Sequence, residues 1–162
     1  MNMGINRDDF IAAMRGVASS VAVVTTGGPA GRYGTTVTSF CSVSADPPAM
    51  LTCIHAQSRF APIVEGNGHF AINVLSEGEE QIAQRFAGAD DDKVDDRFTD
   101  IALHPESADV PLIAGATVLL CKLDRLVDGN THRIVIGSVT MAQRSSNAPL
   151  LYMAGDYQAL AT

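Results

Sequence analysis

The stretch ATVLLCKLDRLVDGNTHRIVIGSVTMAQ, residues 116–143, holds two long runs of β-branched and aliphatic residues on either side of the turn sequence DGN. Such side chains fit the pleated surface of a strand, and a short glycine-containing turn between two such runs is typical of a β-hairpin. We therefore predict a long antiparallel hairpin over this stretch. Its length makes it the feature that decides the expected fold.

Strand-like segments also occur on both sides of this hairpin. VAVVTT, residues 21–26, ends in the turn cluster GGPAG, and the chain returns through GRYGTTVTSF, residues 31–40, as a second hairpin. Three more runs indicate strands, at 49–55, 69–75 and 150–153. With about seven strands and no regular alternation with helices, the sequence favours an antiparallel barrel over a doubly wound parallel sheet.

Helical signals are confined to three segments. Asn6 supplies an N-cap for a helix over about 7–19, in which Phe10, Met14 and Val17 share one face. A short helix is expected over RFAPIVEG after Ser58, and a helix of about ten residues within EGEEQIAQRFAG. These helices are peripheral to the predicted sheet.

The chain of 162 residues is long enough for one domain, and we expect a single domain over residues 1–162. No apolar run approaches the roughly 20 residues that span a bilayer, and the N-terminus lacks the apolar stretch of a secretory signal. We therefore expect a cytoplasmic protein with no membrane partner. Cys41, Cys53 and Cys121 form no CxxC pair, so we expect reduced, buried thiols.

The charge distribution restricts the partners. A net charge of −7 with 11 scattered basic residues argues against nucleic acid, because that binding depends on clustered Lys and Arg. The acidic run at 90–92 with Asp95 and Asp96 is expected to be a solvated loop rather than a metal site. The sequence also lacks the GxSxG, HExxH and P-loop motifs, so hydrolase and kinase activities have no support.

The strand expected at residues 31–40 is unusually rich in hydroxyl groups. They belong to Thr35, Thr36, Thr38 and Ser39, and continue with Ser42 and Ser44. One interpretation is an edge strand with a solvated face, since Thr is a good strand residue. The other is a ligand surface, in which Gly34 lets a flat molecule approach the backbone while the hydroxyls bind it. The residue pattern leaves both interpretations open.

The chain contains four histidines, His55, His69, His104 and His132. We expect His69 and His104 to be structural or exposed. His132 directly follows the turn of the long hairpin, where a side chain projects from the rim of the sheet while the ladder holds its backbone. This position makes His132 a candidate functional residue.

Several motifs taken together resemble one known family. They are VAVVTT, GTTVTSFCSVSADPP, CIHAQSRFAPIVEGNGHFAINVL, QRFAG with DDRF, and THRIVIGSV, all within residues 10–157. On these motifs the chain resembles the short-chain flavin reductases with an FMN-binding split barrel, in particular the reductase components of two-component 4-hydroxyphenylacetate 3-monooxygenases.

The resemblance implies a mainly β fold, namely an antiparallel split β-barrel with two or three peripheral helices, that forms a homodimer. It implies that the protein binds FMN or FAD near the dimer interface and reduces it with NADH or NADPH as hydride donor. The reduced flavin would then pass to a partner, a flavin-dependent monooxygenase.

The resemblance also implies roles for individual residues. Residues 35–39 would run along the isoalloxazine, residues 53–58 would lie on the same ligand, and Ser58 with Arg59 would meet the phosphate at a helix start. His132 would orient the nicotinamide and is the implied catalytic residue. The implied cofactor-binding residues are Thr35, Thr36, Val37, Thr38, Ser39, Cys53, Ile54, His55, Ala56, Gln57, Ser58, Arg59, Phe60, Phe86, Arg97 and Tyr152.

Three alternatives remain at the level of the sequence. The first is a non-catalytic split barrel that stores or senses flavin. The second is an oxidase of the pyridoxamine-phosphate type, which would keep its flavin bound and consume an amine. The third is a small-ligand barrel without redox chemistry, which would ignore flavin.

Overall fold

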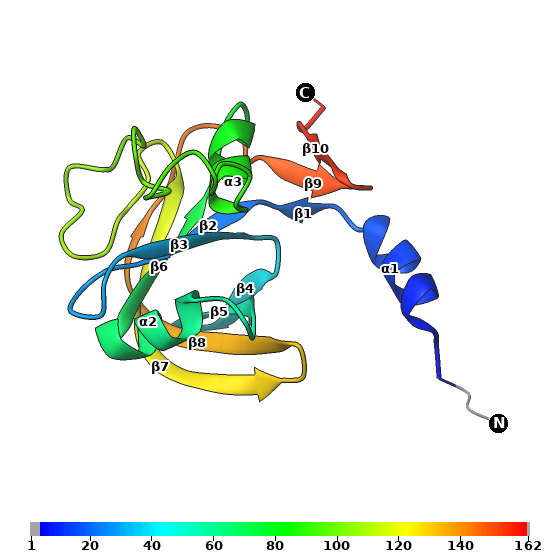
Figure 1. The fold of residues 1–162 in the computed structure, drawn as a ribbon, viewed down its shortest axis with the longest axis horizontal. Helices are drawn as coiled ribbons and strands as arrows, with labels where there is room; N and C mark the ends of the chain where they lie inside the picture. The colour runs from blue at the N-terminus through cyan, green and yellow to red at the C-terminus, as the bar shows by residue number, and fades with distance from the viewer. Residues whose placement is uncertain (1–3, 162) are drawn as a thin grey trace.

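The hairpin predicted over residues 116–143 forms the centre of the structure. In the computed structural model, which describes residues 4–161, β7 (Thr117–Gly129) pairs antiparallel with β8 (His132–Gln143) (Figure 1). Asn130 and Thr131 make the turn, with Asn130 in the left-handed region at φ 56°. Short hairpin turns require such positive φ values. The predicted hairpin is therefore confirmed, with a tighter turn than the expected DGN.

Five further strands extend this ladder on both sides. From β7 the order continues through β6 (His69–Val74) and β2 (Ala22–Thr26) to β3 (Tyr33–Val37), and from β8 through β5 (Pro48–His55) to β4 (Phe40–Ala45). All of these pairs are antiparallel. The mainly β, antiparallel fold expected from the sequence is confirmed.

The two edge strands of this sheet, β3 and β4, are consecutive in the sequence. The link between them is held against β5, because the Ser39 carbonyl accepts hydrogen bonds from Cys53 N at 2.9 Å and from Thr52 Oγ1 at 3.0 Å. Within residues 4–161 no ladder joins β3 to β4. The sheet therefore turns back on itself without closing into a hydrogen-bonded barrel.

Both faces of the central strands are buried, which gives the protein two hydrophobic layers. Along β2, Val23 belongs to one layer and Val24 to the other, as the alternation of side chains along a strand requires. α2 (Phe60–Asn67) buries side chains in the layer of Val24, and α3 (Glu80–Phe86) buries side chains in the layer of Val23. The two inner helices thus cover opposite faces of the sheet.

The predicted helices are present, although two are shorter than expected. α1 (Arg7–Arg15) starts with the predicted cap, in which Asn6 Oδ1 accepts a hydrogen bond from the N–H of Asp9 at 2.8 Å. It ends before residue 19 because Ser19 already pairs with Tyr152 in a strand. α3 covers seven residues. The expected helical regions are therefore correct, and the tertiary contacts set their ends.

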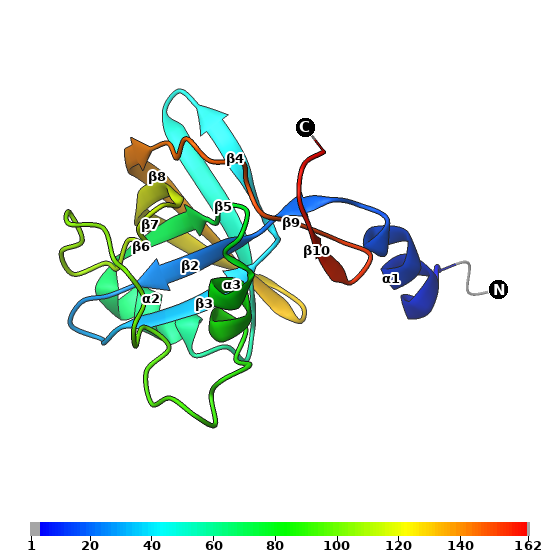
Figure 2. The same ribbon diagram turned by 90° about the horizontal axis from the view of Figure 1, so that it is seen from above.

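A smaller sheet lies beside the large one and contains β1 (Ser19–Ser20), β9 (Leu151–Met153) and β10 (Asp156–Gln158) (Figure 2). The sequence pattern does not predict β1 or β10 because they are too short to show a periodicity. It does not predict β4 as a separate strand because four of its six residues are exposed, which leaves no apolar run. Among residues 4–161 no helix combines the length and apolar character needed to cross a bilayer.

Candidate functional site

Gly34, at the centre of the hydroxyl-rich strand, faces the core. A Cβ added there would lie 2.7 Å from Cε1 and 2.8 Å from Cδ1 of Phe86. The flat group that Gly34 admits is therefore the ring of Phe86, which packs edge to face on Phe98. The expectation that Gly34 leaves room for a flat ligand is wrong, because the space is filled by the chain itself.

The remainder of β3 has features of both interpretations of the strand, the edge strand and the ligand surface. β3 is an edge strand of the large sheet, as the first interpretation holds. Thr36 Oγ1 donates a hydrogen bond to the Ala83 carbonyl at 2.7 Å, so this hydroxyl fixes α3 on the strand. The Gly34 carbonyl accepts from Arg97 Nη1 at 3.2 Å and so points to the open edge. Since backbone groups alternate along a strand, those of Thr36 point to the same open edge.

That open edge borders a cavity of about 190 Å³ between β3, the end of β5 and the β7–β8 turn, which we call the β3–β5 cavity. Its lining is made up entirely of residues that the sequence places in the candidate site. They are Thr35, Thr36, Val37, Ser39, Cys53, Ile54, His55, Ser58 and His132. The structure thus brings together, from three separate segments, nine of the predicted residues.

Backbone contacts fix the walls of this cavity. The Ala56 N–H donates to the Thr131 carbonyl at 2.9 Å, which fastens the end of β5 to the turn of the long hairpin. The Ser58 hydroxyl accepts from the Phe60 N–H at 3.2 Å and so orients the first turn of α2. The cavity is therefore defined by strand ends and a helix start.

His55 and His132 lie opposite each other at the mouth of the cavity. They are partners in the β5–β8 ladder, and their rings meet edge to face with centroids 5.2 Å apart. His55 Nδ1 accepts the Gln57 N–H at 3.2 Å, which places the proton of the neutral ring on Nε2. Both side chains are exposed, so they can contact a ligand that enters the cavity.

The thiols differ strongly in environment. Cys53 lines the cavity and is half-buried, and its pKa is raised by burial and secondarily by Cys41. Burial raises the pKa of Cys121 to about 12. All three cysteines are free. The expectation of buried thiols is correct for Cys121 and wrong for Cys41, which is exposed because it lies in the mostly exposed strand β4.

A second hollow of about 360 Å³ adjoins the first, and we call it the arginine hollow. Arg59 and Arg97 both lie near the Tyr33 ring, with guanidinium carbons 5.7 and 5.3 Å from its centroid. The hollow is lined by Arg32, Tyr33, Gly34, Arg59, Asp91, Val94, Asp95, Asp96, Arg97 and Phe98. Two predicted residues, Arg59 and Arg97, therefore belong to this hollow.

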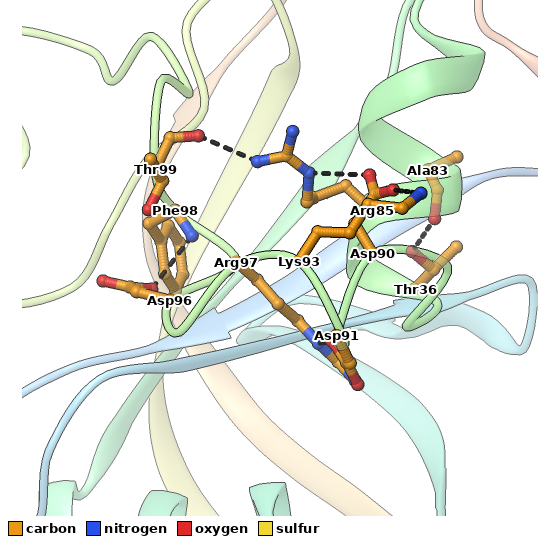
Figure 3. Close-up of polar contacts among 10 residues, drawn as sticks. All are labelled: Thr36, Ala83, Arg85, Asp90, Asp91, Lys93, Asp96, Arg97, Phe98 and Thr99. Atoms are coloured by element: carbon orange, nitrogen blue, oxygen red, sulfur yellow. Dashed lines mark hydrogen bonds and ion pairs between the residues drawn. The ribbon is translucent and has the colours of Figure 1, made fainter.

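The acidic run supplies three aspartates to the lining of this hollow. Basic side chains hold the run as a loop (Figure 3). Asp91 accepts two hydrogen bonds from Arg97, at 2.7 and 2.6 Å, and these hold the pKa of the Asp91 carboxyl below its usual range. Arg97 also donates to the Phe86 carbonyl at 2.9 Å. Asp90 bridges Arg85 and Lys93. The run is thus a loop with Asp91 and Asp95 exposed to solvent, as expected, and ion pairs hold it in place.

Several predicted residues lie outside both hollows. Phe60 and Phe86 are fully buried core residues, so neither presents a surface to a ligand in this structure. Tyr152 packs on Tyr157 with ring centroids 5.4 Å apart, and it lines a groove beside α1 together with Thr38. Ala56 and Gln57 are exposed beyond the lining.

Sequence reasoning missed eight of the ten lining residues of the arginine hollow, among them Arg32, Tyr33 and Asp96. Arg32 pairs with Asp96 across it, and its guanidinium also lies 4.7 Å from the centroid of Phe98. The available signal was the motif DDRF, which contains Asp96 and Arg97, but the distance in sequence between Arg32 and Asp96 hides their contact.

Comparisons with known proteins agree on one family. The sequence matches the flavin reductase like domain over residues 14–161. A flavin reductase (NADH) of Kitasatospora aureofaciens is 38% identical over 159 residues, covering 94% of this chain and 81% of that protein. A 4-hydroxyphenylacetate 3-monooxygenase reductase component of Salmonella dublin is 38% identical over 116 residues, covering 72% and 68%.

Solved structures agree with the sequence comparisons. Flavin reductase PheA2 in its native state superposes with a TM-score of 0.87 at 28% identity, over 98% of this chain and 100% of that one. The NADH:FAD oxidoreductase SgcE6 of Streptomyces globisporus, in complex with NAD and FAD fragments, gives a TM-score of 0.85 at 32% identity, over 96% and 93%.

Proposed function

Because the chain belongs to the flavin reductase-like family, we propose that it is an NADH-dependent reductase that converts FMN or FAD to the reduced flavin. The observation that carries the proposal is the β3–β5 cavity, whose whole lining comes from segments that match the family's flavin motifs. NADH is the favoured donor because two of the similar proteins are named as NADH-dependent, the flavin reductase (NADH) of Kitasatospora aureofaciens and SgcE6. The reduced flavin then passes to a flavin-dependent monooxygenase, as the names of related reductase components indicate.

The backbone of β3 suits the polar edge of a flavin ring. The ring's pyrimidine edge needs alternating donors and acceptors, and the open edge of β3 offers the N–H and C=O groups of Thr36. The Thr35 hydroxyl adds a further donor at the cavity wall. The N–H and hydroxyl donors among these groups favour the negative charge that the reduced ring acquires.

Hydride transfer is chemistry of the two bound molecules, and the chain has to hold their rings in contact at about 3.5 Å. His132 lies at the mouth of the cavity, where it would orient the nicotinamide over the flavin site. Ser58 and Arg59 lie at the beginning of α2 and would bind the flavin phosphate. Arg97 is held by Asp91 and two carbonyls, so its role is to fix the loop on β3.

We also propose a homodimer with a split-barrel subunit, a single domain, and a cytoplasmic location in which the three free thiols stay reduced. α1 supports the dimer, because it stands apart from the large sheet and none of its residues is buried (Figures 1 and 2). Phe10 and Met14 on this helix are 55% and 50% exposed. The groove beside it is lined by Phe10, Ile11, Met14, Val17, Tyr152 and Met153 among others.

The apolar side chains of this groove are unusually exposed for their size. Its six large apolar side chains are between 36% and 55% exposed, and gathered apolar exposure of this kind marks an interaction surface. Thr38 lines the same groove and lies between Val37 and Ser39, which line the β3–β5 cavity. A second copy seated on this face would therefore lie next to the flavin site.

The test of function is anaerobic mixing of the purified protein with NADH and, in turn, FMN, FAD and riboflavin. A reductase bleaches the visible absorbance of the flavin rapidly and oxidises NADH in equal amount. A protein that binds flavin without bleaching it would be a storage or sensing module, which is the second candidate. A colourless protein that binds none of the three flavins would contradict both.

A further inference from the structure

The arginine hollow and the β3–β5 cavity are neighbours along the same two segments. Tyr33 and Gly34 line the hollow while Thr35 lines the cavity, and Arg59 lines the hollow while Ser58 lines the cavity. Successive strand residues are about 3.3 Å apart, so a molecule that occupies the cavity can extend directly into the hollow. A flavin that carries a phosphate tail has this extended shape.

The hollow contains cations, but the loop neutralises them. Its lining has three arginines, Arg32, Arg59 and Arg97, against three aspartates of the loop, so its formal charge is zero. Arg97 is bound to Asp91 through both oxygens and is mostly buried, with 17% of its side chain exposed. Arg59 forms no ion pair within residues 4–161.

The pair between Arg32 and Asp96 differs from the pair between Arg97 and Asp91. Its two side chains are 46% and 45% exposed, and such solvated pairs contribute little to stability. A phosphate monoester, or a diphosphate taken as a whole, carries more negative charge than a carboxylate, and its oxygens accept parallel hydrogen bonds from a guanidinium fork. Replacement of Asp96 by a phosphate at Arg32 is therefore favourable. Replacement of Asp91 by a phosphate at Arg97 would instead detach the loop from β3.

We propose that the arginine hollow binds the phosphate ester of an extended ligand by displacing Asp96 from Arg32, so that Asp96 sets the affinity for phosphorylated ligands. The inference rests on the proposed function, since the ligand ring would occupy the flavin cavity. Asp96 acts as a resident anion that keeps Arg32 in place and competes with the incoming phosphate. Phosphate can come from the flavin or from the nicotinamide nucleotide, and both offer the same chemistry to Arg32.

The test compares Asp96→Asn with Asp95→Asn in the full chain. Asn keeps the acceptor for the Phe98 N–H, which Asp96 Oδ1 now supplies at 2.9 Å, so the loop geometry is retained. Asp95 lines the same hollow, and its substitution removes the same charge without freeing an arginine. Calorimetric titration with FMN, FAD and riboflavin measures the flavin arm, and KM values for NADH and NADPH measure the nucleotide arm.

If the inference holds, Asp96→Asn tightens the binding of FMN and FAD by about two- to fivefold, the strength of one exposed ion pair, and leaves riboflavin unchanged. A selective fall in the KM of NADPH would instead identify the nucleotide as the source of the phosphate. Arg32→Gln should lower the affinity for that phosphorylated ligand until it approaches the affinity for the unphosphorylated counterpart.

Equal effects of Asp96→Asn and Asp95→Asn would show a general field effect and overturn the exchange. An equal gain for riboflavin, or no change in either arm, would also overturn it while the reductase activity stands. A wild-type protein that binds no flavin at all would contradict the proposed function itself, so the two failures are distinguishable.

Discussion

His55 and His132 face each other across the β5–β8 ladder, with ring centroids 5.2 Å apart. The two residues lie 77 positions apart in the sequence, and the pairing of β5 with the long hairpin brings them together at the mouth of the β3–β5 cavity. The pair marks the side of the cavity from which a second ring would approach.

Replacement of His132 should impair the use of NADH while leaving flavin binding nearly unchanged. Because His132 lies at the mouth and not on β3, His132→Ala should lower kcat/KM for NADH by about ten- to a hundredfold, the effect of a misplaced reacting ring. The dissociation constant of FMN should stay within a factor of about two. Steady-state kinetics and flavin titration measure the two quantities. His69→Ala, an exposed histidine outside the cavity, is the control, and an unchanged NADH KM and kcat in His132→Ala would refute the assignment.

The three thiols should react in a defined order with an alkylating reagent near pH 8. Exposed Cys41 reacts first, Cys53 reacts more slowly because its pKa is raised, and FMN protects Cys53 because that thiol lines the cavity. With a pKa of about 12, Cys121 is a thiolate in only about one molecule in 10⁴. Mass spectrometry of peptides with and without FMN measures the rates. Alkylation of Cys53 at the same rate in both samples would place the flavin elsewhere.

The exposed apolar side chains of α1 predict that the proposed dimer interface lies on this helix. Phe10→Ser combined with Met14→Ser should convert the dimer to a monomer at micromolar concentration, because it removes two apolar side chains from the groove. Light scattering during gel filtration gives the mass. Ala12→Ser with Ala13→Ser lowers the helix propensity of α1 without changing large apolar groups and should stay dimeric. A wild-type protein that is monomeric while it reduces flavin would rule out this interface.

Gly34 is expected to be a stability position. Gly34→Ala puts a methyl group within 2.8 Å of two atoms of the fully buried Phe86 ring, so the free energy of unfolding should fall by about 1–3 kcal/mol. Urea denaturation measures the change. In Gly16→Ala the nearest atom is 3.5 Å away and φ is −78°, so this control should be close to neutral. Equal stabilities of the wild type and Gly34→Ala would contradict the packing described here.

Local signals predicted the elements of the fold well. The hairpin at residues 116–143 and the cap at Asn6 are specified by neighbouring residues, and both are present. The short strands β1 and β10 are each held by pairing with β9. β9 lies far from β1 in the sequence, and its pairing with β10 depends on the turn between them. The strands with no pattern of their own are therefore the ones that local reasoning omits.

Only part of the candidate site was recognised, because the sequence shows contiguous segments but not contacts between distant ones. Motif resemblance indicated all nine lining residues of the β3–β5 cavity, because each motif is a contiguous segment. It also included Phe60 and Phe86, which lie in the core, since a segment does not specify which face of an element is buried. Arg32 was omitted because its partner, Asp96, belongs to another segment.

The sequence by itself determined that this chain builds an antiparallel sheet from hairpins, since strand period, turn residues and caps act over a few residues. Only the tertiary structure decided that Gly34 holds the Phe86 ring, that His55 meets His132, and that the acidic loop neutralises the arginine hollow. These relationships join residues that are distant in the chain, and their energies come from packing and charge pairing that exist only after the sheet has turned back on itself.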